Sequence, residues 1–314
     1  MSNQSIPDYD LLVVGEINPD FILQGGDLTP VFGQAEKLVD DAALTIGSSS
    51  VMVACGAARL GLRTAFIGVV GNDVFGHFML DAMRARKIDT SGCRVDASVQ
   101  TGFSIILSQP ADRAILTYPG SIAKLSLGDV DTGMLARARH LHVGGYFLLE
   151  SLRPDLPELF GRAKAQGSST SLDTNWDPSG RWDAGLGELW PMCDVFLPNE
   201  QELLKIAGQE KFEAALDTLS TQIPTIAVKA GAKGGVARQG EQTVAAPPLK
   251  VEVVDTTGAG DSFNAGFLYG YLGGWALGQS LRLACACGSL STRGAGGTER
   301  QPTLEEAERA LAET

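Results

Sequence analysis

Residues 255–263 read Asp-Thr-Thr-Gly-Ala-Gly-Asp-Ser-Phe and are the stretch that most strongly indicates the fold. The run 251–254 before them, Val-Glu-Val-Val, is rich in apolar, β-branched residues and predicts a strand, whereas Phe263 and Phe267 recur at helical spacing. We therefore expect a strand that turns into a helix, with residues 258–261 in the first helical turn. The backbone N–H groups of a first turn have no partner within the helix, and the positive end of the helix dipole lies at the same point. The stretch thus predicts an anion site that suits phosphate.

Small residues and one carboxylate define the chemistry of this predicted site. Gly258, Ala259 and Gly260 let a phosphate approach the backbone, so their N–H groups would hold the charge of a transferred phosphoryl group. Asp261 lies beside them and would align a hydroxyl group and accept its proton. The helix dipole favours its ionised form by about 0.3–1 kcal/mol, so we expect a weak base. For Gly-x-Gly alone, a capped helix start with a tight turn is the alternative.

Motifs of several common enzyme classes are missing from the sequence. No Gly-x-x-x-x-Gly-Lys-Ser/Thr loop occurs, and a dinucleotide fingerprint would need its third glycine at Phe263. No Gly-x-Ser-x-Gly elbow occurs, and His77, His140 and His142 lie far from any nucleophile motif. The net charge of −12, without a basic stripe, argues against nucleic acid or an anionic membrane as the main partner.

Composition places the chain among ordinary globular proteins, with 44% apolar and 20% charged residues. The apolar run 11–14 near the start is too short for a signal or membrane segment. The cysteines are odd in number and lack paired C-x-x-C spacing, so we expect core residues in a reducing compartment, the cytoplasm. They are Cys55, Cys93, Cys193, Cys285 and Cys287.

Short apolar runs alternate with segments of helical periodicity through most of the chain. Because the runs are continuously apolar, we expect strands that are buried on both faces, as in a parallel sheet covered by helices. The predicted class is α/β, a three-layer sandwich with a mostly parallel central sheet flanked by helices, in a single domain over residues 1–314. The predicted strands are 11–15, 65–68, 140–144, 171–173, 195–197 and 226–228, and the predicted helices include 51–60, 75–86, 152–165, 200–207 and 212–219.

Two segments, about 18–45 and 101–118, break this pattern. The first has no helical period, and the second carries two apolar runs around a Pro-Ala-Asp-Arg turn at 110–113. We expect short antiparallel strands that project from the main sheet as a small β appendage. This appendage is called the lid below.

The nonapeptide resembles the signature of the ribokinase-like (PfkB) family of carbohydrate kinases, which reads Asp-Thr-Thr-Gly-Ala-Gly-Asp. Further blocks of the chain resemble family segments in the same order and extend the resemblance over nearly the whole sequence. The resemblance implies an ATP-dependent kinase that transfers the γ-phosphate to a hydroxyl group, a primary CH2OH, of a small carbohydrate. The further blocks are 13–20, 47–61, 68–76, 199–202 and 231–234.

The same resemblance implies ATP and Mg2+ as cofactors, K+ as a further ion, and a homodimer formed through the lid. It also assigns roles to individual residues of this sequence. Substrate contacts fall to Asn18, Asp20, Gly47, Ser48, Phe103 and Arg113, nucleotide contacts to Asn199, Glu202, Lys229, Gly231 and Gly234, water-mediated magnesium contact to Glu202, and a monovalent cation to Asp255 and Thr257.

Several of these residues also suit a purely structural role. Asn18 and Asp20 suit a turn after a strand, and serines that open a helix, such as Ser48, are commonly caps. Asn199 with Glu202 is nearly a capping box. The glycines of 231–234 suit a turn at a strand end.

The sequence departs from the family pattern at two positions. Met52 stands where the family has an asparagine that touches the sugar, so we expect a different substrate pocket. Asp177 stands where some fructokinases and sugar-acid kinases carry an arginine, which disfavours sugar acids, although Arg113 keeps 2-keto-3-deoxygluconate open.

The resemblance also leaves two further functions open. A nucleoside kinase of the same superfamily would use the same anion site with a different acceptor. A sugar-binding regulator could keep the fold and be catalytically silent. Retention of Asp261 argues against the silent regulator, because a protein that only binds sugar needs no base there.

Overall fold

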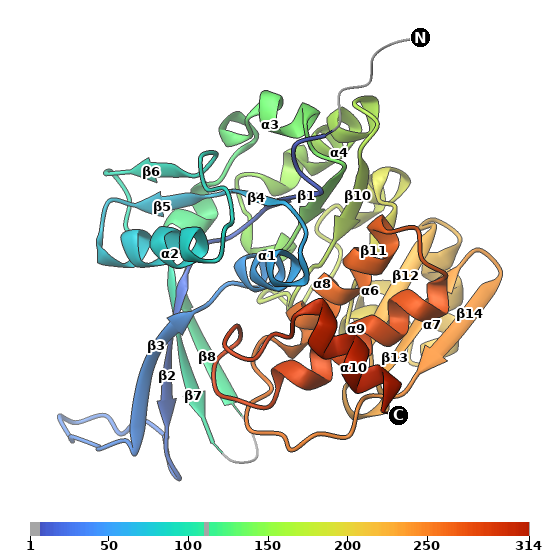
Figure 1. Cartoon of the computed structure of the whole chain (residues 1–314). Coiled ribbons are helices and arrows are strands. Elements are labelled where there is room, and N and C mark those ends of the chain that lie inside the picture. Colours follow the sequence, from blue (N-terminus) through green and yellow to red (C-terminus); the bar gives the residue numbers. More distant parts are fainter. Residues whose placement is uncertain (1–6, 110–112, 314) are drawn as a thin grey trace.

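A computed structural model describes residues 7–109 and 113–313 (Figure 1), so residues 110–112 of the predicted turn lie outside the described part. An eight-stranded sheet forms the centre, in the order β14-β13-β12-β11-β10-β9-β1-β4. The strands from β4 to β12 in this order are parallel, and β13 and β14 add an antiparallel edge. Their bounds are β1 Leu11–Val14, β4 Thr64–Ile67, β9 His140–Val143, β10 Ser169–Leu172, β11 Val195–Phe196, β12 Thr225–Lys229, β13 Gly235–Gln239 and β14 Gln242–Ala246.

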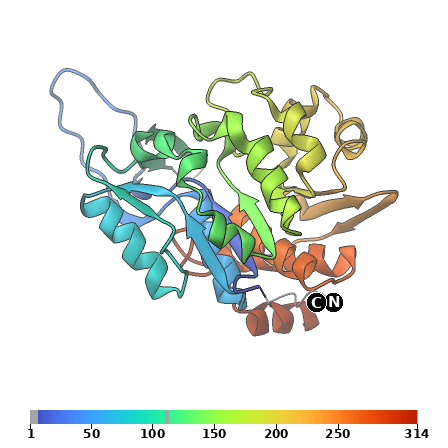
Figure 2. The same cartoon turned by 90° about the horizontal axis from the view of Figure 1, so that it is seen from above.

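Helices cover both faces of this sheet (Figure 2), as the continuously apolar strands predict. In β1, Leu12 and Val14 belong to one hydrophobic core and Leu11 and Val13 to the other, because successive side chains of a strand point to opposite faces. The three-layer α/β prediction is therefore confirmed. The first core is covered by α3 Thr132–Ala136, α4 Leu156–Ala165, α5 Leu186–Leu189, α6 Glu200–Ala207 and α7 Phe212–Ser220, and the second by α1 Ser49–Leu60, α2 Val74–Ala85, α8 Ala259–Leu272, α9 Leu277–Ser291 and α10 Leu304–Ala312.

The lid is a separate four-stranded sheet that projects from the body (Figure 1), in the order β3-β2-β7-β8. Its strands are β2 Pro19–Gln24, β3 Asp41–Ile46, β7 Phe103–Ser108 and β8 Arg113–Tyr118. The predicted segments are confirmed, but the expectation of purely antiparallel pairing is wrong, since β2 and β7 are parallel. The chain between them passes through the body and a second small parallel pair, β5 Val69–Gly71 with β6 Arg94–Asp96. Such a long crossover is what parallel pairing requires.

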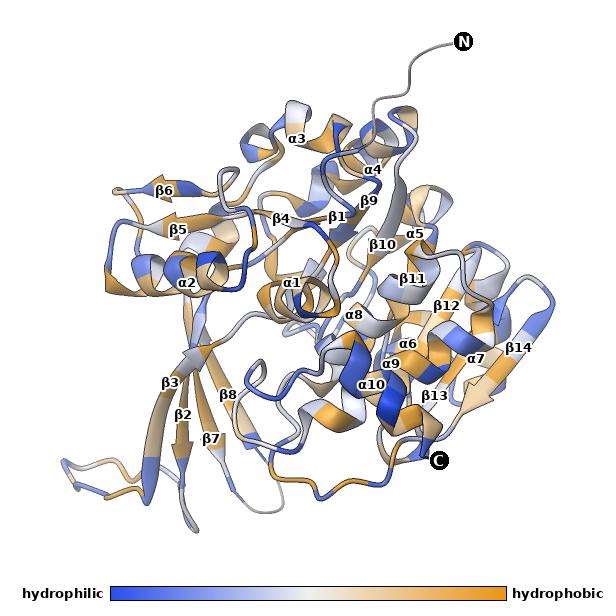
Figure 3. Cartoon of the chain, viewed as in Figure 1, coloured by the Kyte–Doolittle hydropathy of each residue, from blue (hydrophilic) through white to orange (hydrophobic). Residues whose placement is uncertain are grey.

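The predicted strand at 251–254 does not form. Pro247 and Pro248 follow β14, and proline donates no hydrogen bond to a sheet, so the ladder ends there. The chain then runs irregularly along the outside, where it forms a hydrophobic stretch (Figure 3) with Val253 and Val254 59% and 61% exposed. The N–H of Val254 instead donates to the Thr292 carbonyl at 2.8 Å.

Two further expectations from composition can be compared with the structure. All five cysteines are free, and all but Cys93 are buried, as expected for small core residues. Across residues 7–109 and 113–313, no helix combines the length and the apolar character that a membrane crossing needs.

Candidate active site

Residues 255–261, called the anion loop below, enter α8 through a left-handed turn. Gly258 is the N-cap residue of α8 and has a φ of 70°. A Cβ atom on Gly258 would lie 2.5 Å from the Gly297 carbonyl oxygen and 2.9 Å from the Met52 sulfur. Both the backbone conformation and the close packing therefore require glycine at this position.

The anion loop presents unpaired backbone donors. Within the described part of the chain, the N–H groups of Gly258, Gly260 and Asp261 have no hydrogen-bond acceptor. The N–H of Ala259 instead donates to the Thr256 carbonyl at 3.3 Å. The sequence predicted the N–H groups of residues 258–260 as the donors. In the structure the N–H of Ala259 closes the turn, and the N–H of Asp261 is the third free donor.

Asp261 lies in the first turn of α8 and is half-buried. Its Oδ1 accepts a short hydrogen bond from the Ser49 hydroxyl of α1. Burial and the nearby negative charge of Asp173 raise the pKa of Asp261 to about 7, against the opposing effects of Ser49 and Lys229. The expectation of a weak base is therefore wrong, since burial and a neighbouring carboxylate outweigh the helix dipole. A pKa near neutrality suits a general base.

Lys229 and Asp173 form a buried ion pair behind the anion loop. Lys229 ends β12, Asp173 follows β10, and Lys229 Nζ donates to Asp173 Oδ2 at 2.7 Å. Burial alone would raise the pKa of Asp173, but Lys229 outweighs it and lowers the pKa. A Cβ on Gly260 would lie 3.2 Å from Lys229 Cδ. The lysine therefore brings positive charge to the edge of the loop.

Asn199 and Glu202 form a full capping box at the start of α6, which confirms their structural role. Asn199 Oδ1 accepts from the Glu202 N–H at 2.9 Å, and Glu202 Oε2 accepts from the Asn199 N–H at 2.8 Å. Burial raises the pKa of Glu202 to about 7, although Lys229 opposes the shift. The Glu202 carboxyl group is thus close enough to Lys229 and Asp173 for their charges to act on it. Its contact with magnesium through a water stays a prediction.

Asn18 and Asp20 lie at the base of the lid and are only 4% and 6% exposed. Asn18 Nδ2 donates to Asp20 Oδ1 at 3.2 Å, and a Cβ on Gly47 would lie 2.2 Å from the same oxygen. Burial raises the pKa of Asp20 to about 7, against the attraction of Arg113. The structure thus brings three of the predicted substrate residues together.

The start of α1 joins this group to Asp261. Gly47 touches Asp20, and Ser49, two residues later, donates to Asp261. Consecutive Cα atoms are about 3.8 Å apart, so the two carboxyl groups lie within a few ångströms of one short segment. The sugar side and the phosphoryl side of the predicted site are therefore adjacent.

Arg113 connects the lid to the anion loop. Its Nη1 donates to Thr257 Oγ1 at 3.3 Å, and its charge acts on Asp20. Thr257 in turn donates its N–H and its hydroxyl to Asp255 Oδ1 at 2.9 and 2.8 Å, while Gly296 N–H donates to Asp255 Oδ2 at 3.0 Å. Asp255 and Thr257 thus bond each other within the loop, and the Arg113 guanidinium group contacts Thr257. Their binding of a monovalent cation stays a prediction.

Three of the residues named from the sequence take structural roles. Ser48 caps α1, because its hydroxyl accepts from the Val51 N–H at 3.0 Å and donates to the Glu16 carbonyl at 2.6 Å. Met52 packs under the anion loop rather than beside Asp20. Phe103 points away from Asp20, since Ser104 pairs with Asp20 and neighbouring residues of a strand face opposite ways.

The Phe103 ring belongs to an aromatic cluster with Phe21, Phe75 and Tyr118. The prediction that Phe103 contacts the substrate therefore loses its basis. Its ring instead supports the base of the lid.

Gly231 and Gly234 form the tight turn between β12 and β13 that their spacing suits. Both have positive φ, and the Gly234 N–H donates to the Gly231 carbonyl at 2.9 Å. Lys233 is an exposed residue paired with Glu200. This turn follows Lys229 directly, so a nucleotide contact there stays a prediction.

Asp177 does not face a substrate. It is buried, and its carboxylate accepts from the Ser179 N–H at 2.8 Å and the Trp182 N–H at 2.7 Å, so it holds its own loop. The expected charge conflict with sugar acids therefore has no structural basis.

Sequence reasoning missed four residues of the site. Glu16 is fully enclosed and accepts from Ser50, Ser49 bonds Asp261, and Asn264 donates to the Asp173 carboxylate. Glu16 and Ser49 had a signal, because they lie in the blocks 13–20 and 47–61 that resemble the family. Glu16 and Asn264 act through contacts distant in the sequence.

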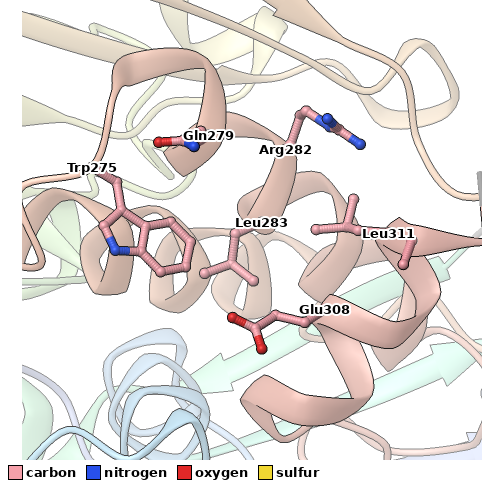
Figure 4. Close-up of a pocket in the computed structure, with 7 residues that line it drawn as sticks. Trp275, Gln279, Arg282, Leu283, Glu308 and Leu311 are labelled. Carbon is pink, nitrogen blue, oxygen red and sulfur yellow. The ribbon is translucent and has the colours of Figure 1, made fainter.

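A pocket of about 440 Å³ lies between α9 and α10, lined by residues that include Trp275, Arg282 and Glu308 (Figure 4). None of the predicted site residues lines this pocket. This pocket is therefore separate from the candidate active site around Asp261.

The fold and the site together define a class of enzyme. A near-neutral carboxylate, free backbone donors at a helix start and a buried lysine suit transfer of a phosphoryl group to a hydroxyl. The protein is thus a phosphotransferase with an alcohol group as acceptor. Residues 9–304 match the family model described as pfkB family carbohydrate kinase, and the chain belongs to this family.

Individual relatives agree with this assignment. An uncharacterized sugar kinase from Archaeoglobus fulgidus is 31% identical over 220 residues, covering 70% of this chain and 87% of the relative. A fructokinase from Klebsiella pneumoniae is 31% identical over 283 residues, covering 84% of this chain and 91% of the relative. An E. coli protein described as a ribokinase II, solved with ATP and Mg2+, superposes with a TM-score of 0.86 at 23% identity, covering 98% of this chain and all of that one. The chain is therefore a sugar kinase with the ribokinase-like fold.

Proposed function

We propose that this sugar kinase transfers the γ-phosphate of ATP to a primary CH2OH group of a small neutral sugar in one in-line step. The observation that carries the proposal is the position of Asp261 in the first turn of α8, where its carboxylate lies beside the free N–H groups of Gly258 and Gly260. Burial raises the pKa of this carboxylate to about 7, which suits a base. Asp261 aligns the hydroxyl and accepts its proton. The N–H groups of Gly258, Gly260 and Asp261 stabilise the charge on the transferred group. No covalent enzyme intermediate is needed.

The two substrates bind on either side of the anion loop. Asn18 and Asp20 hold sugar hydroxyls, because a buried carboxylate can accept from two of them at once. Gly47 leaves room for the sugar beside Asp20. Lys229 and the turn at 231–234 line the nucleotide side.

ATP would arrive with Mg2+, as in the E. coli structure described above. Magnesium is commonly held by substrate phosphates, waters and one or two carboxylates, and Glu202 can supply one carboxylate through a water. Among the described residues no group of three His, Cys, Asp or Glu side chains could hold a metal alone, which fits an ion that binds with the nucleotide.

A monovalent cation such as K+ is a further part of the proposal. Asp255 and Thr257 would hold it, although the guanidinium group of Arg113 already contacts Thr257. Equal activity in potassium and in a bulky organic cation, at the same ionic strength, would show that the arginine suffices and would end this part of the proposal.

Fructose-like neutral sugars are the first candidate acceptors, since the Klebsiella relative is a fructokinase. A keto-deoxy sugar acid is the second, because Arg113 lies between Asp20 and the anion loop and could pair with a carboxylate. A panel of neutral hexoses, pentoses, keto-deoxy acids and nucleosides, measured by ADP release, decides between them. Sugar binding without ADP release from any acceptor would favour a silent regulator and contradict the proposal.

We also propose that the whole chain acts as one domain and assembles as a dimer through the lid. The strands of the lid carry many hydrophobic residues (Figure 3), and on one face Leu44 and Leu116 are 42% and 57% exposed. These residues lie on the two edge strands of the lid, and sheet edges with apolar faces gain from pairing with a second copy. Sedimentation of the parent and of a Leu116→Lys variant tests the dimer.

The free cysteines suit a cytoplasmic enzyme.

A further inference from the structure

A line of buried polar side chains runs along β9 and β10 toward the end of these strands, where Asp173 pairs with Lys229. His140 and His142 of β9 pair with Ser169 and Ser171 of β10, and Asp173 follows β10. Both histidines, Ser171 and Asp173 are almost completely buried. Because alternate residues of a strand point to the same face, these side chains form one row.

Hydrogen bonds connect this row. His140 Nδ1 bonds Ser169 Oγ, His140 Nε2 bonds Ser171 Oγ, and His142 Nδ1 bonds the same Ser171 oxygen, each at 2.7 Å. Burial lowers the pKa of His140 to about 3 and that of His142 to about 4, so both rings are neutral at pH 7. A neutral imidazole has one donor and one acceptor nitrogen. Ser171 has a single hydrogen and can donate to only one of the two rings, so the tautomer of His142 sets the direction of the row.

The charge of Asp173 selects that direction. His142 Nε2 is buried and has no partner among the residues that the structure describes. The Asp173 carboxylate acts on the His142 ring and favours a proton on it. An N–H at Nε2 is thus favoured over a lone pair, which leaves Nδ1 of His142 as an acceptor. Ser171 then donates to His142, His140 donates to Ser171, and Ser169 donates to His140.

Asn264 of α8 contacts Asp173 from the other side. Its Nδ2 donates to Asp173 Oδ2, the oxygen that also accepts from Lys229 Nζ at 2.7 Å. Asn264 Oδ1 is buried and likewise lacks a partner within residues 7–109 and 113–313. A buried polar atom without a partner costs about 1–3 kcal/mol of stability. His142 Nε2 and Asn264 Oδ1 are two such atoms near the Lys229–Asp173 ion pair, so stability alone does not explain these side chains.

We propose that Asn264, through its direct hydrogen bond, and His142, through the N–H dipole at Nε2, are positioning residues for Asp173, which in turn holds the Lys229 ammonium group beside the anion loop. The inference rests on the phosphoryl transfer proposed above. Lys229 links Asp173 to the anion loop, because its ammonium group bonds Asp173 and its stem packs against Gly260. A shift of Asp173 therefore moves positive charge relative to the transferred phosphoryl group, and misplacement of about 1 Å can cost about 100-fold in rate.

A pair of substitutions at His142 tests the positioning directly. In His142→Gln the amide reaches the place of Nε2, whereas in His142→Asn it reaches only the place of Nδ1 and keeps the Ser171 bond. We expect His142→Gln to retain most of kcat and His142→Asn to lose about tenfold or more, with similar melting temperatures and similar KM for ATP. Equal losses in the two variants, or no loss in either, would overturn the inference.

The pH profile of kcat gives a second test through the ion pair. The charged groups that act on Asp261 are Asp173 and Glu16, which raise its pKa, and Lys229, which lowers it. Asp173→Asn should therefore move the acidic limb to lower pH, and Lys229→Met should move it to higher pH. Shifts in the same direction, or unchanged limbs, would contradict the proposed geometry.

Nitrogen NMR of the histidine rings separates this inference from the proposed activity. The direction derived above predicts the Nε2–H tautomer for both His140 and His142, whether or not any sugar is phosphorylated. An Nδ1–H tautomer in either ring would overturn the positioning. If the tautomers agree but no acceptor releases ADP, the proposed function fails and the hydrogen-bonded row stands.

Discussion

The anion loop and the lid form two sides of one site, but they rest on different physical features. The anion loop works with backbone donors, whose geometry follows from a glycine at a left-handed helix start. The lid works with the side chains of Asp20 and Arg113, which a second sheet brings to the loop. A short motif therefore predicts the first, whereas the second depends on strand pairing. Changes in the loop should affect every acceptor, and changes in the lid should affect acceptor choice.

The largest effect is expected for Asp261→Asn. Loss of the general base should lower kcat by about 10²- to 10⁴-fold for every acceptor. ATP affinity and the melting temperature should stay near the parent values, because the amide keeps the shape of the carboxylate. Steady-state ADP release and calorimetric ATP titration measure both, with the exposed Glu305→Gln as control. An active variant would dismiss Asp261 as the base.

Gly260→Val should impair the nucleotide side next. The added side chain would meet Lys229, since a Cβ there lies 3.2 Å from Lys229 Cδ, and would cover the Gly260 donor. We expect ATP affinity to fall by about tenfold or more, as for loss of hydrogen bonds to a charged group. Gly161→Ala in α4, where a Cβ meets nothing within 4 Å, is the control for adding a side chain to a helical glycine. Unchanged ATP binding would contradict the placement of the phosphate.

Asp20→Asn isolates the lid side. The amide loses acceptor capacity and charge, so kcat/KM for the sugar should fall by about 10- to 100-fold while KM for ATP stays constant. Initial rates over a matrix of sugar and ATP concentrations separate the two effects. If KM for ATP changes as much as KM for the sugar, the division between loop and lid is wrong.

Ser49→Ala should give the smallest effect and a defined pH signature. The Ser49 hydrogen bond lowers the pKa of Asp261, so its loss should raise that pKa above about 7. The base is then protonated over a wider range, and the acidic limb of kcat moves to higher pH. Near pH 8 we expect a loss of only about threefold to tenfold. A limb that moves to lower pH would contradict the contact.

The parts of the fold that sequence predicted well depend on local patterns. The capping box of Asn199 and Glu202 and the helix start near residue 258 need only neighbouring residues, and both formed. The helix begins at Ala259, one residue later than expected, because Gly258 is the N-cap residue. The buried strands were also predictable, because their continuous apolar character reflects helices on both faces. The run 251–254, Val-Glu-Val-Val, is also rich in β-branched residues, but prolines after β14 prevent its pairing.

The parts that sequence could not predict depend on distant residues. Burial and Asp173, which lies far away in the sequence, reverse the expected weak basicity of Asp261. The face of the lid on which Phe103 lies could not be predicted, because only the pairing of β7 with β2 fixes it. The roles of Glu16 and Asn264 could not be predicted, since their partners Ser50 and Asp173 come from other elements.

A crystal structure of the protein with its best acceptor sugar, ADP, magnesium and an aluminium fluoride mimic of the phosphoryl group tests the central claim most directly. We predict the mimic within hydrogen-bonding distance, about 2.7–3.1 Å, of the N–H groups of Gly258, Gly260 and Asp261. The acceptor hydroxyl should lie between the mimic and the Asp261 carboxylate. A mimic bound away from residues 258–261, or an Asp261 side chain that does not contact the acceptor hydroxyl, would contradict the account.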